Sequence, residues 1–177
     1  MLNRAMPLHL DLGCGDGSFL TMIARQNPHK DFLGVERLTK RVRSAARKTA
    51  GLTNVRIIRA DTLFVLERLL GPESVEACYL LFPDPWPKRR HHRRRLISSG
   101  FLASVWSVLI PAGTLQIATD HTEYFAQIWG LVNRSNHFQI IERDMELDSV
   151  DSTFGKRFRA AGVPIHRLEL RKISPVT

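Results

Sequence analysis

Short apolar segments alternate with longer amphipathic ones along most of this chain, and this alternation restricts the folds it can adopt. The apolar segments are rich in Leu, Val and Ile, and we expect each to form a β-strand. Before position 120 they are Leu8 to Leu12, Asp31 to Glu36, Val55 to Arg59, Val75 to Phe82 and Thr114 to Thr119.

The intervening segments carry apolar residues at helical spacing. They are Ser18 to Arg25, Thr39 to Ala50, Thr62 to Leu69 and Leu96 to Leu109. Strict alternation of strands and helices predicts an α/β fold of the doubly wound type, in which helices cover both faces of a mostly parallel sheet.

The rest of the chain adds one helix and two strands to this pattern. We expect the helix at Tyr124 to Ser135 and the strands at Phe138 to Glu142 and Ile165 to Arg171, which makes a seven-stranded sheet. The stretch from Asp144 to Gly162 has weak periodicity and is expected to be a long connection over the active face or a flap. At 177 residues without an internal repeat, residues 1–177 suit a single domain.

The formal net charge of +9 points to a polyanionic partner. No acid lies between Asp84 and Asp120, whereas six Arg or Lys residues do, so we attribute the charge largely to this segment. Charge clustered in this way favours nucleic acid. An anionic membrane is less favoured, because the segment lacks interleaved bulky apolar residues.

The cysteines and histidines indicate neither a disulfide nor a metal site. Cys14 and Cys78 have no metal-ligand spacing, and the histidines form no H-x-x-E-H or related arrangement. The N-terminus has no apolar region with a cleavage site, and no run is long enough to cross a bilayer. We therefore expect a cytoplasmic protein without a metal.

A glycine-rich turn follows the first expected strand. Gly13, Gly15 and Gly17 alternate with other residues and lead into a helix. Glycines at these positions let the backbone turn tightly and let a ligand approach the main chain. In a parallel sheet this turn lies at the carboxyl edge of the strands, where ligands bind.

The spacing of the glycines discriminates between two cofactor classes. A dinucleotide-binding turn has the pattern G-x-G-x-x-G, but counted from Gly13 its third glycine position is Ser18, and Gly17 comes one residue early. G-x-G-x-G followed by an acid at the next strand end instead resembles the S-adenosylmethionine-dependent methyltransferases. That acid is Glu36, which could accept hydrogen bonds from both ribose hydroxyls.

Three carboxylates follow successive strands at equal spacing. Asp11, Glu36 and Asp61 are each separated by 25 residues, and all are expected at one edge of the sheet. They suit the cationic sulfonium and amino groups of S-adenosylmethionine, whereas a pyrophosphate there would be repelled. This electrostatic argument favours the methyl donor independently of the glycine spacing.

The segment after the fourth expected strand reads F-P-D-P-W-P-K from Phe82 to Lys88 and continues into a basic run. It holds one carboxylate, Asp84, at the end of an apolar run, and six Lys or Arg residues follow between Lys88 and Arg95. An acid beside dense positive charge again suggests a polyanionic substrate.

With these residues assembled, the chain closely resembles the tRNA (guanine-N7)-methyltransferase family from about Leu8 to Arg171. The most specific part of the match is Phe82 to Lys88 with His91, His92 and the arginine run, and the A-T-D-H sequence at Ala118 to His121 supports it. The resemblance implies a Rossmann-like class I methyltransferase fold and transfer of a methyl group from S-adenosylmethionine to N7 of a guanine in the variable loop of tRNA.

The resemblance also implies roles for individual residues. Asp84 corresponds to the catalytic-site acid, which also lies at the cofactor site. The implied cofactor contacts are Asp11, Glu36 and Asp61; the substrate contacts are Lys88 and Asp120; the tRNA-binding arm is Arg90, His91, His92, Arg93, Arg94 and Arg95. A substrate-site T-x-[FY]-E element corresponds to Ser152, Thr153, Phe154 and Gly155, so the hydroxyl is kept at Ser152 and the family's glutamate is replaced by Gly155.

Methylation at N7 needs no general base, because this nitrogen has an in-plane lone pair and carries no proton. The protein must align the two reactants and stabilise the positive charge that develops on the purine. We assign this charge stabilisation to Asp84. Asp84 or Asp120 could also accept hydrogen bonds from guanine N1–H and N2–H, a pair of donors that adenine does not offer.

Three other functions remain open at this stage. Asp84-Pro85-Trp86 is similar to the [DNS]-P-P-[FYW] motif of enzymes that methylate exocyclic amines, although Trp86 replaces the second proline. A non-catalytic RNA-binding protein could keep the fold and the arm. A Rossmann dehydrogenase is disfavoured by the glycine spacing. A protein partner is neither required by the sequence nor excluded.

Overall fold

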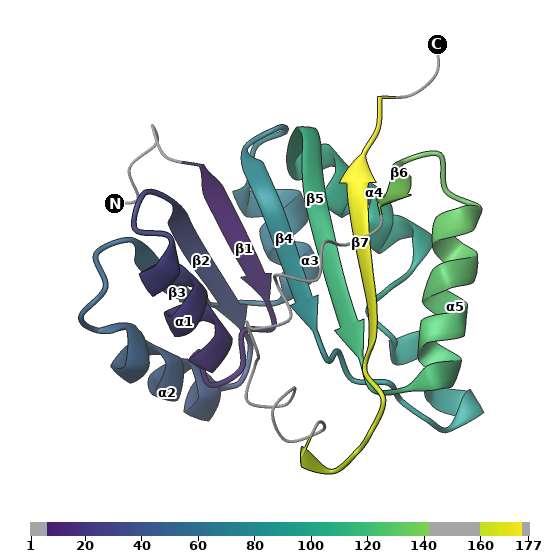
Figure 1. The fold of residues 1–177 in the computed structure, drawn as a ribbon, viewed down its shortest axis with the longest axis horizontal. Coiled ribbons are helices and arrows are strands. Elements are labelled where there is room, and N and C mark those ends of the chain that lie inside the picture. Colours follow the sequence, from purple (N-terminus) through teal and green to yellow (C-terminus); the bar gives the residue numbers. More distant parts are fainter. Residues whose placement is uncertain (1–6, 142–159, 175–177) are drawn as a thin grey trace.

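A computed structural model describes residues 7–141 and 160–174, and the described strands form one seven-stranded sheet (Figure 1). Across the sheet the strand order is β3-β2-β1-β4-β5-β7-β6. The first five strands run parallel, and β7 is antiparallel to both of its neighbours. The strands are β1 (Leu8–Leu12), β2 (Asp31–Glu36), β3 (Val55–Arg59), β4 (Val75–Leu81), β5 (Leu109–Thr119), β6 (Phe138–Ile141) and β7 (His166–Lys172).

Helices cover both faces of the sheet and bury two separate apolar clusters. On one face α1 and α2 pack against the sheet, and on the other η1, α4 and α5 do. The helices are α1 (Ser18–Gln26), α2 (Thr39–Thr49), α3 (Thr62–Phe64) with its π-helical continuation η1 (Val65–Leu69), the 3₁₀ helix η2 (Arg89–Arg94), α4 (Ser99–Val108) and α5 (Thr122–Asn133). The predicted doubly wound, mostly parallel sheet is confirmed.

The largest departure from the predicted elements lies between α4 and β5. The helix expected at Leu96 to Leu109 begins only at Ser99, because the Ser98 hydroxyl accepts a hydrogen bond from the Phe101 amide at 3.1 Å and caps it. Strand β5 begins five residues before the predicted Thr114, at Leu109, which pairs with Val75.

The early part of β5 was not predicted because its residues favour a turn. It includes Pro111, Ala112 and Gly113, and Ala112 has a left-handed φ of 61°. The pairing register with β4 shifts in this region, as it does at a β-bulge. Pairing with β4 therefore overrides the local turn preference. The predicted connection from Asp144 to Gly162 lies almost entirely outside the described residues.

The strand order reverses between β1 and β4. From this point the chain passes to β2 and β3 on one side and to β5 on the other. The arrowheads of β1, β4 and β5 all point to the same edge in Figure 1. In open parallel sheets the crevice beside such a reversal, at the carboxyl ends of the strands, is where ligands bind.

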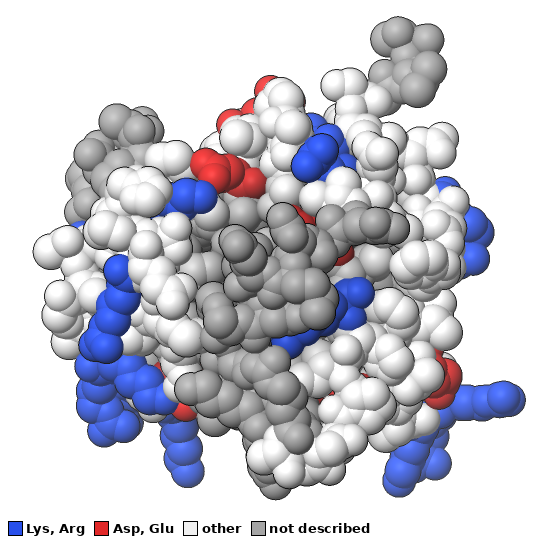
Figure 2. Space-filling model, in the orientation of Figure 1, with Lys and Arg blue, Asp and Glu red and all other residues white. Residues whose placement is uncertain are grey.

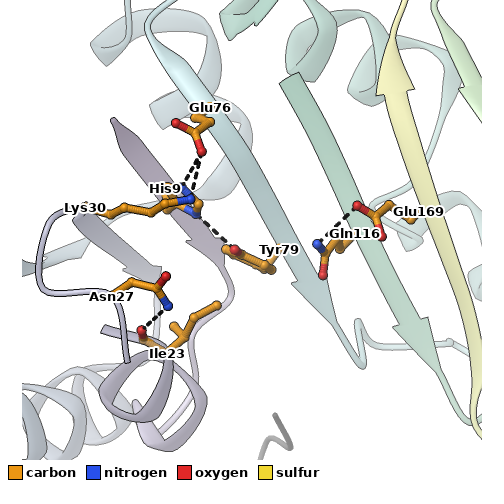
Figure 3. Close-up of polar contacts among 8 residues, drawn as sticks. All are labelled: His9, Ile23, Asn27, Lys30, Glu76, Tyr79, Gln116 and Glu169. Carbon is orange, nitrogen blue, oxygen red and sulfur yellow. Dashed lines mark hydrogen bonds and ion pairs between the residues drawn. The ribbon is translucent and has the colours of Figure 1, made fainter. Parts of the chain in front are cut away.

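A buried polar cluster joins β1 to β4 near the opposite edge (Figure 3). His9 Nδ1 lies 3.0 Å from the Tyr79 hydroxyl, and His9 Nε2 lies 3.3 Å from Glu76, to which Lys30 also donates at 2.8 Å. Burial, with Lys30 nearby, lowers the pKa of His9 to about 4, so the ring is neutral at pH 7. A neutral ring donates to Glu76 and accepts from Tyr79, which fixes the strand pair that carries Asp11.

Gly17 is required for packing between helices. Its φ is 77°, and a Cβ at this position would lie 2.8 Å from both Cα and Cβ of Ala45 in α2. Gly13 differs, since its φ is 81° but no atom of the described residues lies within 4 Å of an added Cβ. The glycine-rich turn therefore serves two purposes: Gly17 lets α1 approach α2, and Gly13 leaves the main chain open.

We predict that Gly17→Ala lowers the free energy of unfolding by about 2–4 kcal/mol, because the new Cβ overpacks against Ala45 and strains a left-handed backbone. The melting temperature should fall by roughly 5–15 °C. Gly51→Ala is the control, because an added Cβ at Gly51 meets no atom within 4 Å. Equal melting temperatures for the two variants would contradict this assignment.

Candidate cofactor and nucleic-acid site

A cavity of about 690 Å³ lies at the carboxyl edge of β1, β2, β3 and β4. Its wall contains Gly13, Glu36 and Asp61, which follow or end the first three strands. The same cavity reaches Asp84 and Trp86 in the loop after β4. The structure therefore brings three of the predicted cofactor residues together with the predicted catalytic acid, whereas Asp11, Gly15 and Gly17 are not among the lining residues.

Glu36 is held in place by backbone amides. Its side chain is 5% exposed; Oε2 accepts a hydrogen bond from the Gly15 N–H at 3.2 Å and Oε1 from the Leu38 N–H at 2.8 Å. The Arg41 guanidinium lies 3.9 Å from Oε2. A carboxylate oxygen has two lone pairs, so each oxygen can still accept from a ligand hydroxyl.

Asp11 is the most deeply buried of the three strand-end acids. The residue is 2% exposed, and within the described part of the chain its Oδ2 has no hydrogen-bond partner. Burial, and then the negative charge of Glu36, raise the pKa of Asp11 to about 8. Its neighbours Leu12 and Gly13 line the cavity. An unpartnered buried carboxyl next to a cavity fits a ligand with a positively charged group there, because such a group would stabilise the ionised form.

Asp61 begins helix α3 as well as lining the cavity. Its Oδ1 accepts from the amides of Leu63 and Phe64, at 2.9 and 3.3 Å. This N-cap holds the carboxylate at the cavity wall. The sequence indicated a ligand contact here but not the capping role.

The loop that carries Asp84 has an unusual backbone. Phe82 and Trp86 both have left-handed φ angles, 54° and 43°. Such conformations cost about 1–3 kcal/mol each in residues with a side chain, and they persist where the surrounding structure holds them. Here the Phe82 amide donates to a carbonyl of β5 at 2.7 Å, and the Pro85 carbonyl accepts from Arg95 Nε at 2.7 Å. The exposed Asp84 lies between these two anchors.

Arg95 is buried, so the prediction that it contacts RNA is wrong for this structure. Its side chain is 1% exposed, and its guanidinium lies 3.3 Å from Glu123 and 4.8 Å from the centre of the Tyr124 ring. It also donates to Gln127 of α5. Arg95 therefore connects the Asp84 loop, through the Pro85 carbonyl, to α5.

The rest of the basic arm forms η2 and its flanks. Arg94 lies over the Trp86 ring at 5.0 Å and lines the cavity, and the His91 ring meets Trp86 edge-on at 5.8 Å. His92 is partly buried, with Nε2 3.6 Å from Glu123. The exposed cations of η2 and its flanks are Lys88, Arg89, Arg90, Arg93 and Arg94.

The predicted substrate residues are placed less completely. Asp120 follows β5, whose neighbour β4 leads to Asp84, but Asp120 does not line the cavity. Lys88 is exposed and precedes η2. Ser152 and Thr153 lie outside the described residues. The structure therefore groups Asp84 with the cofactor residues and leaves the substrate contacts on the surrounding surface.

Sequence reasoning missed two cations of the cavity wall. Arg37 and Arg41 line it, together with Leu38. Arg37 directly follows Glu36, and Arg41 lies in the first turns of the helix that follows. Positions just after a strand-end acid lie at the same edge of a parallel sheet, which is the signal that could have identified them. Within the described parts of the chain, no helix is long and apolar enough to span a membrane.

Comparisons with known proteins agree with this geometry. A family model described as "Putative methyltransferase" matches residues 5–168. The chain is 33% identical over 177 residues to a tRNA (guanine-N(7)-)-methyltransferase of Thermotoga maritima. The aligned region covers 98% of the chain and 56% of that relative. It is 35% identical over 170 residues to the enzyme of the same name in Rubrobacter xylanophilus. This aligned region covers 93% of the chain and 76% of that relative.

A solved structure shows the same fold. The 16S rRNA methyltransferase KamB superposes with a TM-score of 0.67 at 21% identity, over 97% of this chain and 91% of that one. At this identity the similarity concerns the fold alone. The chain spans just over half the length of the Thermotoga relative and about three quarters of the Rubrobacter relative.

We predict that Arg95→Ala lowers the free energy of unfolding by about 2 kcal/mol, because it leaves the partly buried Pro85 carbonyl without this donor and removes the contact with Tyr124. The melting temperature should fall by roughly 4–8 °C. Arg93→Ala, which removes an exposed cation of the same arm, should leave it unchanged. Similar losses in both variants, measured by thermal unfolding, would rule out a special anchoring role for Arg95.

Proposed function

The chain belongs to the tRNA (guanine-N7)-methyltransferase family, and on that premise we propose that it transfers a methyl group from S-adenosylmethionine to N7 of a guanine in tRNA. The observation that carries the proposal is the shared cavity. Glu36 and Asp61 stand at one side of it and Asp84 at another, beside an exposed basic arm. A methyl donor and a nucleic-acid base can thus meet in one place.

The residues present fit the methyl donor, and residues 1–177 would act as one methyltransferase domain. Glu36 would accept from ribose hydroxyls with the lone pairs that the backbone amides leave free. Asp11 would face the positively charged part of the ligand, and Asp61 would add a third carboxylate at the wall. The open main chain at Gly13, together with Gly15 and Gly17, lets the ligand approach the turn. S-adenosylmethionine supplies an electrophilic methyl group when bound.

Asp84 would act on the guanine. Its carboxylate would accept hydrogen bonds from the base and stabilise the positive charge that develops as N7 gains the methyl group. The strained loop is anchored at Phe82 and Pro85 and would hold this carboxylate in position before the base binds. The carboxylate and the base would then need little further alignment during the reaction. Lys88, Asp120, Ser152 and Thr153 would make further substrate contacts.

We place the enzyme in the cytoplasm. The exposed part of the arm would bind phosphates of the tRNA and so position the tRNA on the protein. Its members are Arg90, Arg93 and Arg94, with His91 and His92 beside them. Contacts of this kind position nucleic acid without reading its sequence. Arg94 also reaches the cavity over Trp86, so it connects the phosphate-binding surface to the site of the base.

We expect the purified chain to produce labelled 7-methylguanosine from unmodified tRNA and methyl-labelled S-adenosylmethionine. Digestion of the RNA and identification of the labelled nucleoside is the measurement. A labelled exocyclic amine would indicate the amine-methylating alternative. Binding of tRNA without any label would indicate the non-catalytic one.

The role of Asp84 can be tested with Asp84→Asn. Removal of the negative charge should lower kcat by roughly 100-fold, because the charge that develops on the purine is no longer stabilised. Glu67→Gln removes an exposed acid of η1 and is the matched control. If Asp84→Asn kept the kcat of the wild type, charge stabilisation by Asp84 would be refuted.

We also predict that binding of S-adenosylmethionine releases a proton. With a pKa of about 8, Asp11 is protonated in about 0.9 of the free molecules at pH 7 and in about 0.1 at pH 9. A cationic group beside the carboxyl lowers this pKa, so about 0.9 protons should be released at pH 7 and few at pH 9. Calorimetric titration in two buffers of different ionisation enthalpy measures the release.

Asp11→Asn is the control for this experiment, because its side chain does not titrate. It should bind without proton release at either pH. A wild-type binding enthalpy that is the same in both buffers at pH 7 would show that Asp11 does not change its protonation on binding.

A further inference from the structure

A second basic segment, larger than the arm, lies on α2 and β3. Residues 37–60 contain eight Lys or Arg and no acid, whereas residues 88–95, which include the arm, contain six, so the two segments hold 14 of the 26 cations of the chain. The attribution of the net charge largely to the arm was therefore incomplete. We call the eight residues the α2–β3 basic surface: Arg37, Lys40, Arg41, Arg43, Arg47, Lys48, Arg56 and Arg59.

All eight residues are exposed, but they differ in their surroundings. Arg37 and Arg41 line the cavity, and Lys48 is paired with Asp16. Arg56 and Arg59 donate to backbone carbonyls near β3. Part of this surface thus belongs to the cofactor site or to the structure of the domain.

The remaining three cations, Lys40, Arg43 and Arg47, have no such role. Their spacing of three and then four residues places them on one face of α2. Within residues 7–141 and 160–174 no acidic side chain forms an ion pair with any of them. Cations that no described acid neutralises leave a positive potential on this helix face, which attracts anions.

The two basic surfaces lie on either side of the cavity. Figure 2 shows Lys and Arg side chains gathered at the lower left, over α2, and at the lower right, near η2, both toward the carboxyl edge of the parallel strands. The cavity itself receives Arg37 and Arg41 from one surface and Arg94 from the other. An extended polyanion with one unit in the cavity would therefore meet cations in both directions.

We propose that Lys40, Arg43 and Arg47 bind the phosphates of a double-helical arm of the same tRNA whose guanine occupies the cavity. This inference rests on the proposed function and adds a second contact surface to it. The three residues extend over about 10 Å of helix axis, and a duplex presents about one negative charge per 1.7 Å, so one helical arm can supply a phosphate to each.

An anionic membrane fits this surface less well. A helix that binds lipid needs bulky apolar side chains beside its cations. Among the described residues, the exposed large apolar side chains are Leu38, Phe64, Leu69 and Trp129, and none of them lies within α2. The surface is basic without a lipid-facing stripe, which favours nucleic acid.

The test compares Arg43→Gln/Arg47→Gln with Arg134→Gln/Arg171→Gln in the full chain. Arg134 and Arg171 are exposed cations at the opposite edge of the sheet, so they are the matched control. At 0.1 M salt the first variant should bind tRNA on the order of 10-fold more weakly. The slope of the logarithm of the binding constant against the logarithm of the salt concentration should become shallower by about 0.9 for each lost phosphate contact. Its kcat at saturating tRNA and its affinity for S-adenosylmethionine should stay unchanged, and the control should behave as wild type in every assay.

If the first variant keeps the wild-type tRNA affinity and salt dependence and still forms 7-methylguanosine, these residues do not bind tRNA. The inference would then be overturned, and the proposed function would stay intact. A wild-type chain that binds tRNA but forms no 7-methylguanosine would instead contradict the proposed function. Loss of binding to phosphatidylserine vesicles with unchanged tRNA binding would assign the surface to membranes and also overturn the inference. If the double variant unfolds, Lys40→Gln alone tests the surface. The slope of its tRNA binding constant against salt concentration, on logarithmic axes, should become shallower by about 0.9, and an unchanged slope would overturn the inference.

Discussion

The buried carboxyl group of Asp11 is the constraint on which the rest of the site depends. It is the residue before the last in β1, beside the point where the strand order reverses, and its Oδ2 has no partner among the described residues. A buried charge without a partner is unfavourable, so the free protein keeps this group neutral near pH 7, with a pKa of about 8. The polar cluster at His9, Tyr79 and Glu76 fixes the two strands that hold Asp11 in this environment. The domain therefore keeps an unfavourable electrostatic feature that a cationic ligand would relieve.

The two sides of the cavity are built by different physical means. On the donor side, Glu36 and Asp61 are held by backbone amides at the ends of regular strands, so the sheet itself sets their positions. On the acceptor side, Asp84 lies in a strained loop whose geometry depends on the hydrogen bond from the Phe82 amide to a carbonyl of β5 and on Arg95. One buried arginine thus links the stability of the domain to the position of the proposed catalytic acid. Its burial also separates it from the exposed cations that precede it.

Regular features of the fold and of the donor side could be predicted from the sequence, because they follow from periodicity. Strand ends in a parallel sheet share one edge, so acids 25 residues apart were expected to meet, and Glu36 and Asp61 do line one cavity. Features set by tertiary contacts could not be predicted. Burial of Arg95 depends on α5, and the start of β5 depends on pairing with β4 through a segment that favours a turn. The basic face of α2 was overlooked because its pattern was used only to assign a helix.

The most direct test of this account is a crystal structure of the chain with S-adenosylhomocysteine, the product left after methyl transfer. We expect the ligand in the cavity of about 690 Å³, with its ribose hydroxyls at the Glu36 carboxylate, its amino group toward Asp11 and its sulfur facing Asp84. A ligand bound elsewhere, or bound in the cavity with its sulfur directed away from the loop after β4, would contradict the claim that one cavity holds both the methyl donor and the base.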